Sequence, residues 1–157
     1  MKADDPNVVT ASRTSGAPAD VIFEILCDPR RHQEFDGSGM LRGTDASGPV
    51  TGIGDEFVMR MYFERIGAYE MRNTIVEFEP SRRIAWSPTM ADRDEPGWKR
   101  RWGYALEPDG GRTKVTEFLD FSCASPEARE SLGKGRPLAA DAMKASLERL
   151  GTLAEST

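Results

Sequence analysis

The chain has 157 residues, of which 26 are acidic and 21 basic, for a formal net charge of -5 at pH 7. This length predicts one domain, residues 1–157, that needs no disulfide or metal for stability. The acidic balance disfavours nucleic acid and anionic lipid surfaces as partners. Cys27 and Cys123 form no C-x-x-C pair, which argues against a zinc ribbon or a dithiol redox site. No stretch suits a secretory signal or a membrane span, so we expect a cytoplasmic protein.

The N-terminal part predicts one strand and two short helices. The strand begins at Val8 and is closed by Ser15-Gly16. Pro18 and Asp20 suit the first turn of a helix, and Asp28-Pro29 ends it. Apolar residues recur between them at helical spacing and give this helix one buried side. A second short helical stretch, residues 30–35, leads into a glycine-containing turn at residues 36–39.

From Asp55 the hydrophobic pattern changes to a period of two. Phe57, Met59, Met61 and Phe63 alternate with more polar residues, which predicts a strand with one apolar face. Further strands are expected over residues 69–79, 83–87, 99–107 and 112–122, with turn signals between them. Because no helical pattern intervenes, we expect an antiparallel meander and not βαβ units.

The C-terminal part predicts a long helix. Helical sequence follows Ser125-Pro126, is interrupted between Gly133 and Pro137, and resumes over residues 138–154. Large apolar residues such as Met143 fall on one side of it, and small residues such as Ala142 widen that side. A helix lined by small side chains leaves room beside it.

This order of elements, with the segments 29–39, 77–86 and 115–117, resembles the START/Bet v 1 (SRPBCC) superfamily, most closely its polyketide cyclase/dehydrase-like branch. The resemblance covers nearly the whole chain. It implies an α+β helix-grip fold, in which a curved antiparallel sheet of about seven strands wraps around the long C-terminal helix. It also implies a deep cavity between sheet and helix. Superfamily members bind lipids, hormones or aromatic polyketides, so the fold does not fix the function.

Two residues are candidates for acid-base chemistry. His32 is the only histidine, and its ordinary pKa lies near neutrality. Its charged neighbours, such as Arg31 and Glu34, favour a solvated surface histidine instead. Glu117 shares the parity of apolar neighbours in its strand, where burial would raise its pKa. We favour the simpler interpretation, in which Glu117 pairs with an arginine of a neighbouring strand, namely Arg60, Arg72, Arg83 or Arg101.

The predicted inner faces carry aromatic and methionine side chains that suit a pliable pocket, although such residues often serve only as core. The facing of Asn73 depends on a bulge expected at Ile75-Val76. Polar groups for orienting a ligand would come from Tyr62, Tyr69, Asn73, Tyr104 and Glu117. The candidate ligand contacts are Met59, Met61, Tyr69, Met71, Asn73, Trp86, Trp102, Tyr104, Ala142 and Met143.

Three functions remain open. The leading hypothesis is the binding of a small hydrophobic molecule by a monomer or homodimer. The second is a polyketide cyclase or dehydratase in which His32 or Glu117 transfers protons. The third is a protein-interaction module of the chaperone-assisting type, for which an exposed apolar patch would be the sign. We expect no metal, because there is one histidine, and no cofactor, because the glycine segments 37–39 and 133–137 lack the spacing and context of nucleotide sites.

Overall fold

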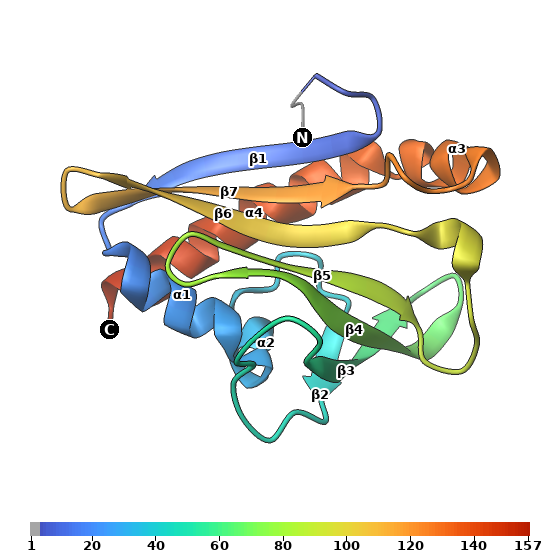
Figure 1. Ribbon diagram of the computed structural model, residues 1–157, viewed down its shortest axis with the longest axis horizontal. Helices are drawn as coiled ribbons and strands as arrows, with labels where there is room; N and C mark the ends of the chain where they lie inside the picture. The colour runs from blue at the N-terminus through green and yellow to red at the C-terminus, as the bar shows by residue number, and fades with distance from the viewer. Residues whose placement is uncertain (1–3) are drawn as a thin grey trace.

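The computed structural model describes residues 4–157 and contains one seven-stranded antiparallel sheet with helices on one side (Figure 1). The strand order is β1-β7-β6-β5-β4-β3-β2. The strands are β1 (Val8–Ser15), β2 (Leu41–Thr44), β3 (Glu56–Phe63), β4 (Gly67–Glu79), β5 (Arg83–Met90), β6 (Arg101–Asp109) and β7 (Arg112–Asp120). The helices are α1 (Ala19–Cys27), α2 (His32–Phe35), α3 (Pro126–Lys134) and α4 (Arg136–Glu155), with short 3-10 turns η1 (Pro29–Arg31) and η2 (Pro96–Trp98).

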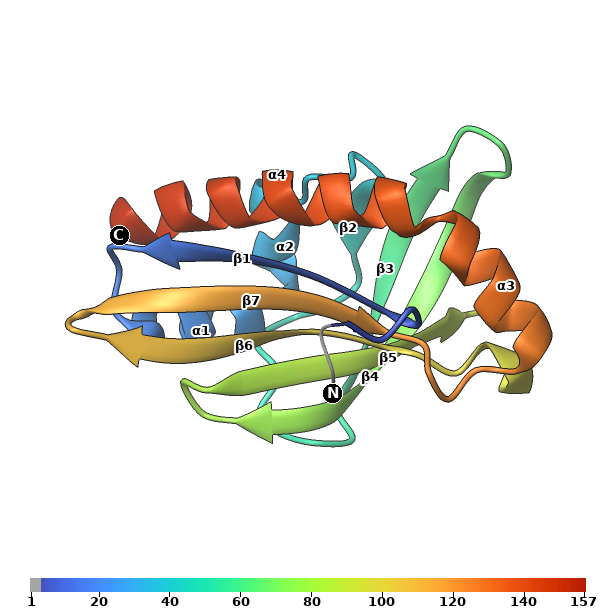
Figure 2. The same ribbon diagram turned by 90° about the horizontal axis from the view of Figure 1, so that it is seen from above.

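The sheet curves around α4, which confirms the predicted helix-grip fold. Figure 2 shows α4 lying along one face of the sheet with β1 directly beside it. Apolar side chains of α1 and of the C-terminal half of α4, including Ile22, Leu147 and Leu150, fill the space at one end of the sheet. A second apolar cluster lies at the other end, where Met143 meets Leu119 and Phe121. Among residues 4–157, no helix is both long and apolar enough to cross a membrane.

Apart from shifts of two residues at ends of β4, β6 and β7, the strands differ from the prediction in two features. The short edge strand β2 was not predicted, because four residues are too few for a period-two pattern, and pairing with β3 alone defines it. β5 extends three residues beyond the predicted end at Ser87, through Pro88. Pro88 is tolerated because β5 pairs with β6 only as far as Trp86, opposite Trp102. The two strands therefore separate at Pro88.

The predicted bulge in β4 is present. The register between β4 and β5 shifts between Ile75 and Glu77, so that one extra residue lies in β4. Asn73, on the other side of the bulge, is buried and shares its face with Met71 and Ile75.

The turn after α2 lies directly against α4. The amide N–H of Gly37 donates to Ser146 Oγ at 2.8 Å. A Cβ on Gly37 would lie 2.5 Å from the carbonyl oxygen of Ala142 and 2.6 Å from the Ser146 nitrogen. Only glycine permits this approach, which fixes the α2 end of the molecule to the middle of α4.

We expect Gly37→Ala to lower the free energy of unfolding by about 1–3 kcal/mol, because its methyl group would be forced against the α4 backbone. Urea denaturation measures the change. Gly133→Ala in α3 is the control, since nothing lies within 4 Å of the added carbon. That variant should be unchanged or stabilised by about 1 kcal/mol. An unaltered midpoint for Gly37→Ala would contradict the role of this contact.

Candidate ligand-binding cavity

A cavity of about 450 Å³ lies between α4 and the inner face of the sheet. This volume falls within the range of small-molecule sites. Its wall is mainly apolar, and side chains of β3, β4, β5 and β6 supply most of it. Five methionines line it, namely Met40, Met59, Met61, Met71 and Met90. Ile66, in the turn between β3 and β4, also lines the cavity and is 62% exposed, so the cavity reaches the surface there.

Most of the predicted ligand contacts line this cavity. They are Met59, Met61, Tyr69, Met71, Asn73, Trp86, Trp102, Tyr104 and Ala142. Their contact with a ligand stays a prediction. They come together because period-two alternation places each of them on the inner face, while Ala142 is the small residue of α4 that faces them.

Two predicted residues lie elsewhere. Met143 is fully buried in the cluster with Leu119 and Phe121, because one step along a helix turns a side chain by roughly 100° away from Ala142. Tyr62 points to the opposite face from Met61 and is 41% exposed. The Arg42 guanidinium carbon lies 5.0 Å from its ring centroid, so its hydroxyl cannot orient a ligand in the cavity.

Aromatic rings form one wall of the cavity. Trp86 is at its centre, with its ring centroid 5.4 Å from His32 in a stacked arrangement and 6.1 Å from Tyr104 in a tilted one. Phe57 meets Trp86 edge to face at 6.1 Å. The rings therefore support one another and present flat apolar surface to the cavity.

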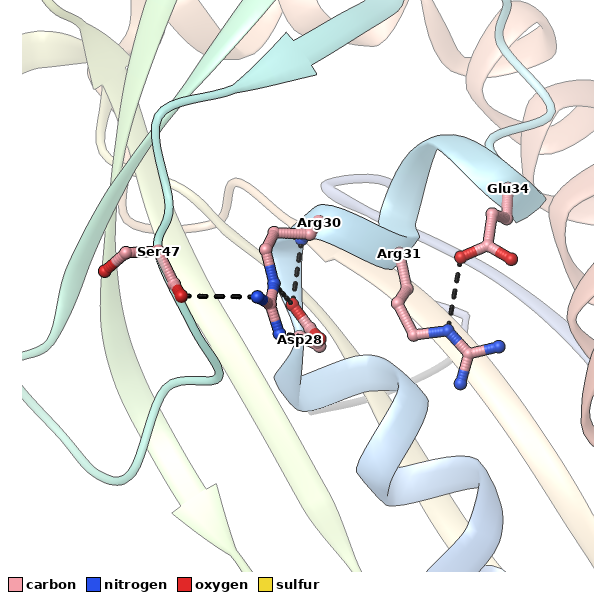
Figure 3. A network of polar contacts seen from close by, with 5 residues as sticks. All are labelled: Asp28, Arg30, Arg31, Glu34 and Ser47. Carbon is pink, nitrogen blue, oxygen red and sulfur yellow. Dashed lines mark hydrogen bonds and ion pairs between the residues drawn. The ribbon is translucent and has the colours of Figure 1, made fainter.

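His32 belongs to this wall, so the expectation of a solvated histidine was wrong. It is only 6% exposed, and its Nε2 lies 2.8 Å from the carbonyl oxygen of Leu26. The charged neighbours that suggested exposure bind other partners. Figure 3 shows Arg30 bound to Asp28 and to the Ser47 carbonyl, and Arg31 bound to Glu34. Sequence neighbours in a turn of helix face different directions, so their polarity does not predict the exposure of His32.

Burial lowers the pKa of His32, and its contact with the Leu26 carbonyl opposes this shift. His32 is therefore neutral near pH 7. A carbonyl oxygen only accepts hydrogen bonds, so Nε2 carries the proton. Nδ1 is then an acceptor, with no hydrogen-bond partner among residues 4–157.

Glu117 is the most deeply buried carboxyl group at the cavity, with 2% exposure. The expected arginine partner is absent among the described residues. Arg83 and Arg101 instead bind Glu77, and Arg101 also binds Asp120, on the other face of the sheet. Trp102 Nε1 donates to Glu117 Oε2 at 2.8 Å, and Oε1 has no hydrogen-bond partner within residues 4–157.

The environment of Glu117 favours its protonated form. Burial raises its pKa to about 8, the Trp102 and Tyr104 side chains oppose the shift, and the charge of Asp36 adds to it. The pKa of Tyr104 is raised well above its ordinary value by burial and by Glu117. Near pH 7 the two groups are therefore a neutral acid and a neutral phenol, and both can donate to an oxygen in the cavity.

The far end of the cavity was missed in the sequence. Glu95, Trp98 and Arg100 line it, and they belong to the η2 loop between β5 and β6. Glu95 and Trp98 lie in a loop, which carries no periodic pattern, so nothing in the sequence indicated that they turn inward. Arg100 fell within the predicted strand 99–107 on the parity of Trp102, so its inward direction could have been predicted. Across the described residues, no three His, Cys, Asp or Glu side chains are grouped to hold a metal ion.

Comparison with known proteins gives the family. The profile of the family described as "Polyketide cyclase / dehydrase and lipid transport" matches residues 7–155. The chain belongs to this family. Its resemblance to the START/Bet v 1-like superfamily is thereby confirmed.

A curated relative and two solved structures resemble this polyketide cyclase/dehydrase-like chain. An uncharacterized protein of Mycobacterium tuberculosis, Rv0088, is 32% identical over 120 residues, covering 76% of this chain and 50% of the relative. This chain therefore spans about half the length of that relative. A solution structure from Arthrobacter aurescens has a TM-score of 0.74 at 13% identity, covering 100% of this chain and 91% of that one. The Polyketide_cyc-like protein Cgl2372 from Corynebacterium glutamicum has a TM-score of 0.60 at 22% identity, covering 94% and 91%.

The wild type is expected to lose free energy of unfolding as the pH rises, and Glu117→Gln is expected to lack this loss. The folded pKa of about 8 lies above the ordinary 4.5, so the native state holds a proton that the unfolded chain releases. This contribution is fully present below about pH 4.5 and is lost as the pH rises through 8. At 1.36 kcal/mol per pH unit the loss is at most roughly 5 kcal/mol.

Urea denaturation between pH 5.5 and 8.5 measures this effect as the difference between wild type and variant, in which the other titrating groups cancel. The wild type should lose a few kcal/mol relative to Glu117→Gln over that range. Glu107→Gln, on the exposed end of β6, is the control, and its free energy of unfolding should change with pH in the same way as that of wild type. Parallel curves for Glu117→Gln as well would show that Glu117 does not titrate in this range.

Proposed function

We propose that the protein binds a small, planar, largely apolar molecule in the cavity between α4 and the sheet. The observation that carries the proposal is the cavity itself, about 450 Å³ of space walled by aromatic rings and methionines. Burial of apolar ligand surface there would contribute roughly 25 cal/mol per Å². Methionine side chains adapt to irregular shapes, so the pocket suits a class of related molecules.

The polar groups of the cavity support a ligand with an oxygen at one end. Glu117 Oε1 is buried without a protein partner, which is costly unless a ligand or water satisfies it. The Tyr104 hydroxyl lies beside the same carboxyl group. A carbonyl or hydroxyl oxygen of a ligand would accept hydrogen bonds from this pair, while Trp86 supports its rings from the side.

Ala142→Phe is expected to abolish binding, because a phenyl group would enter the cavity from α4. Binding is measured with the fluorescent probe N-phenyl-1-naphthylamine, and thermal unfolding against fatty acids, sterols, flavonoids and aromatic polyketides then identifies the ligand class. A ligand at a hundredfold its Kd should add about 2.7 kcal/mol, or roughly 5–10 °C. Leu138→Phe, on the exposed side of α4, is the control and should bind like wild type. Absence of probe binding and of any thermal shift in the wild type would refute the proposal.

A second candidate is cofactor-independent acid-base chemistry on a ketone, as a cyclase or dehydratase would require. The specific observation in its favour is a carboxyl group with a pKa of about 8 in the cavity wall, with a neutral histidine in the same wall. Enolisation needs a donor to the ketone oxygen and an acceptor for the proton on the adjacent carbon. Glu117 would be the donor, and His32 Nδ1 the acceptor.

Exchange of the α-protons of 2-tetralone in D₂O, followed by NMR, tests this chemistry. Wild type should accelerate the exchange, and both Glu117→Gln and His32→Gln should reduce the acceleration by about 100-fold or more while the ketone still binds. Ser38→Ala, at the cavity wall but without an acid or base, is the control. An unaccelerated rate in the wild type, with binding intact, would leave the protein as a binder alone.

A further inference from the structure

Arg100 is placed where two strands separate. β5 and β6 pair as far as Trp86 opposite Trp102, and beyond that point Pro88 and Arg100 do not pair with each other. Two residues before Trp102, the Arg100 side chain lines the cavity with Tyr69 and Trp98. Among the described residues that form the cavity wall, Arg100 is the one arginine or lysine.

The guanidinium of Arg100 has few protein partners. Within residues 4–157 its one hydrogen bond runs from Nη1 to the Trp98 carbonyl oxygen, at 2.8 Å, and no carboxylate lies within ion-pair distance. The outward-facing Arg83 and Arg101 both have carboxylate partners. A guanidinium has five N–H donors in a planar fork, so Arg100 has donors left for a ligand.

Glu95 is the acidic group with the largest electrostatic effect on Arg100, but its carboxylate binds a backbone amide instead. Its Oε1 accepts the Met90 N–H at 3.0 Å, and it forms no ion pair with Arg100 in the described part of the chain. Burial lowers the pKa of Arg100, while Glu95 and Tyr69 oppose the shift. The cation is thus partly desolvated and incompletely neutralised, which strengthens its attraction for an anion.

The two ends of the cavity differ in charge. Four residues of extended chain separate Arg100 from Tyr104, which places them about 13 Å apart along the strand direction. The Tyr104 end holds Glu117 and Asp36, whose charge already disfavours a second negative charge nearby. An anionic group would therefore be repelled from that end and attracted to Arg100.

We propose that Arg100 forms an anion subsite, so that the ligand is a planar apolar molecule carrying one oxyanion, such as a carboxylate. The oxyanion would accept hydrogen bonds from the free N–H groups of Arg100, and the Tyr69 hydroxyl would be a further donor. This inference rests on the proposed function, because it names the chemistry of the ligand in the same cavity.

The test compares two fluorescent probes that share one aromatic framework. 8-Anilino-1-naphthalenesulfonate carries an oxyanion, and N-phenyl-1-naphthylamine lacks it. Arg100→Gln should weaken the binding of the sulfonate probe at least tenfold, since a hydrogen bond to a charged group contributes about 1.5–3 kcal/mol. The neutral probe should bind within twofold of its wild-type affinity. Arg100→Lys, which keeps the charge but loses the fork, should give an intermediate loss for the sulfonate.

Lys99→Gln is the matched control, because it removes the same charge from the neighbouring exposed residue and should change neither probe. Equal effects of Arg100→Gln on both probes, or none on the sulfonate, would overturn the subsite and leave the cavity proposal standing. Failure of both probes to bind wild-type protein would instead refute the cavity proposal itself. Thermal unfolding of each variant checks that the fold is intact.

Discussion

The contact between Gly37 and the backbone of α4 determines where the cavity lies. It holds the α2 turn against the middle of the helix, at Ser146, while β1 lies beside α4 along the sheet. α4 is thereby held from two sides, by the α2 turn and by β1. A single helix cannot fill the whole concave face of a seven-stranded sheet, and the unfilled part is the cavity.

The sheet separates two kinds of polar group by the simple alternation of its strands. On the outer face of β6 and β7, Arg101 and the buried Asp120 form an ion pair. One residue away along each strand, Trp102 and Leu119 face inward, and Glu117 shares that inner side. An acidic residue therefore behaves as a charged partner or as a neutral acid depending only on the parity of its position.

The element order, the bulge in β4 and the inner faces of β3 to β6 could be predicted, because period-two patterns and turn residues are local signals. The environment of His32 could not, and for Glu117 the parity indicated burial but not the lack of an arginine partner. Each depends on tertiary packing, since Trp86 covers His32 and the sheet interior surrounds Glu117. The prediction that Met143 contacts the ligand was wrong, because helix periodicity does not say which neighbour each side of a helix meets. Arg100 was missed although it shares the parity of Trp102 in the predicted strand 99–107. The loss of its pairing with β5 could not be predicted, because it is a property of two strands together.

The two ends of the cavity make different demands on a ligand, and together they orient it. A Glu117 whose pKa is raised by burial to about 8 is mainly neutral at pH 7, so it would donate to a ligand oxygen without adding charge. Arg100 carries charge that no carboxylate in the described chain pairs with. An anionic group directed toward Arg100 places the opposite end of the molecule at Glu117 and Tyr104, next to His32. For an anionic ligand, Arg100 would thus decide which part of the molecule meets the groups proposed to donate and transfer protons.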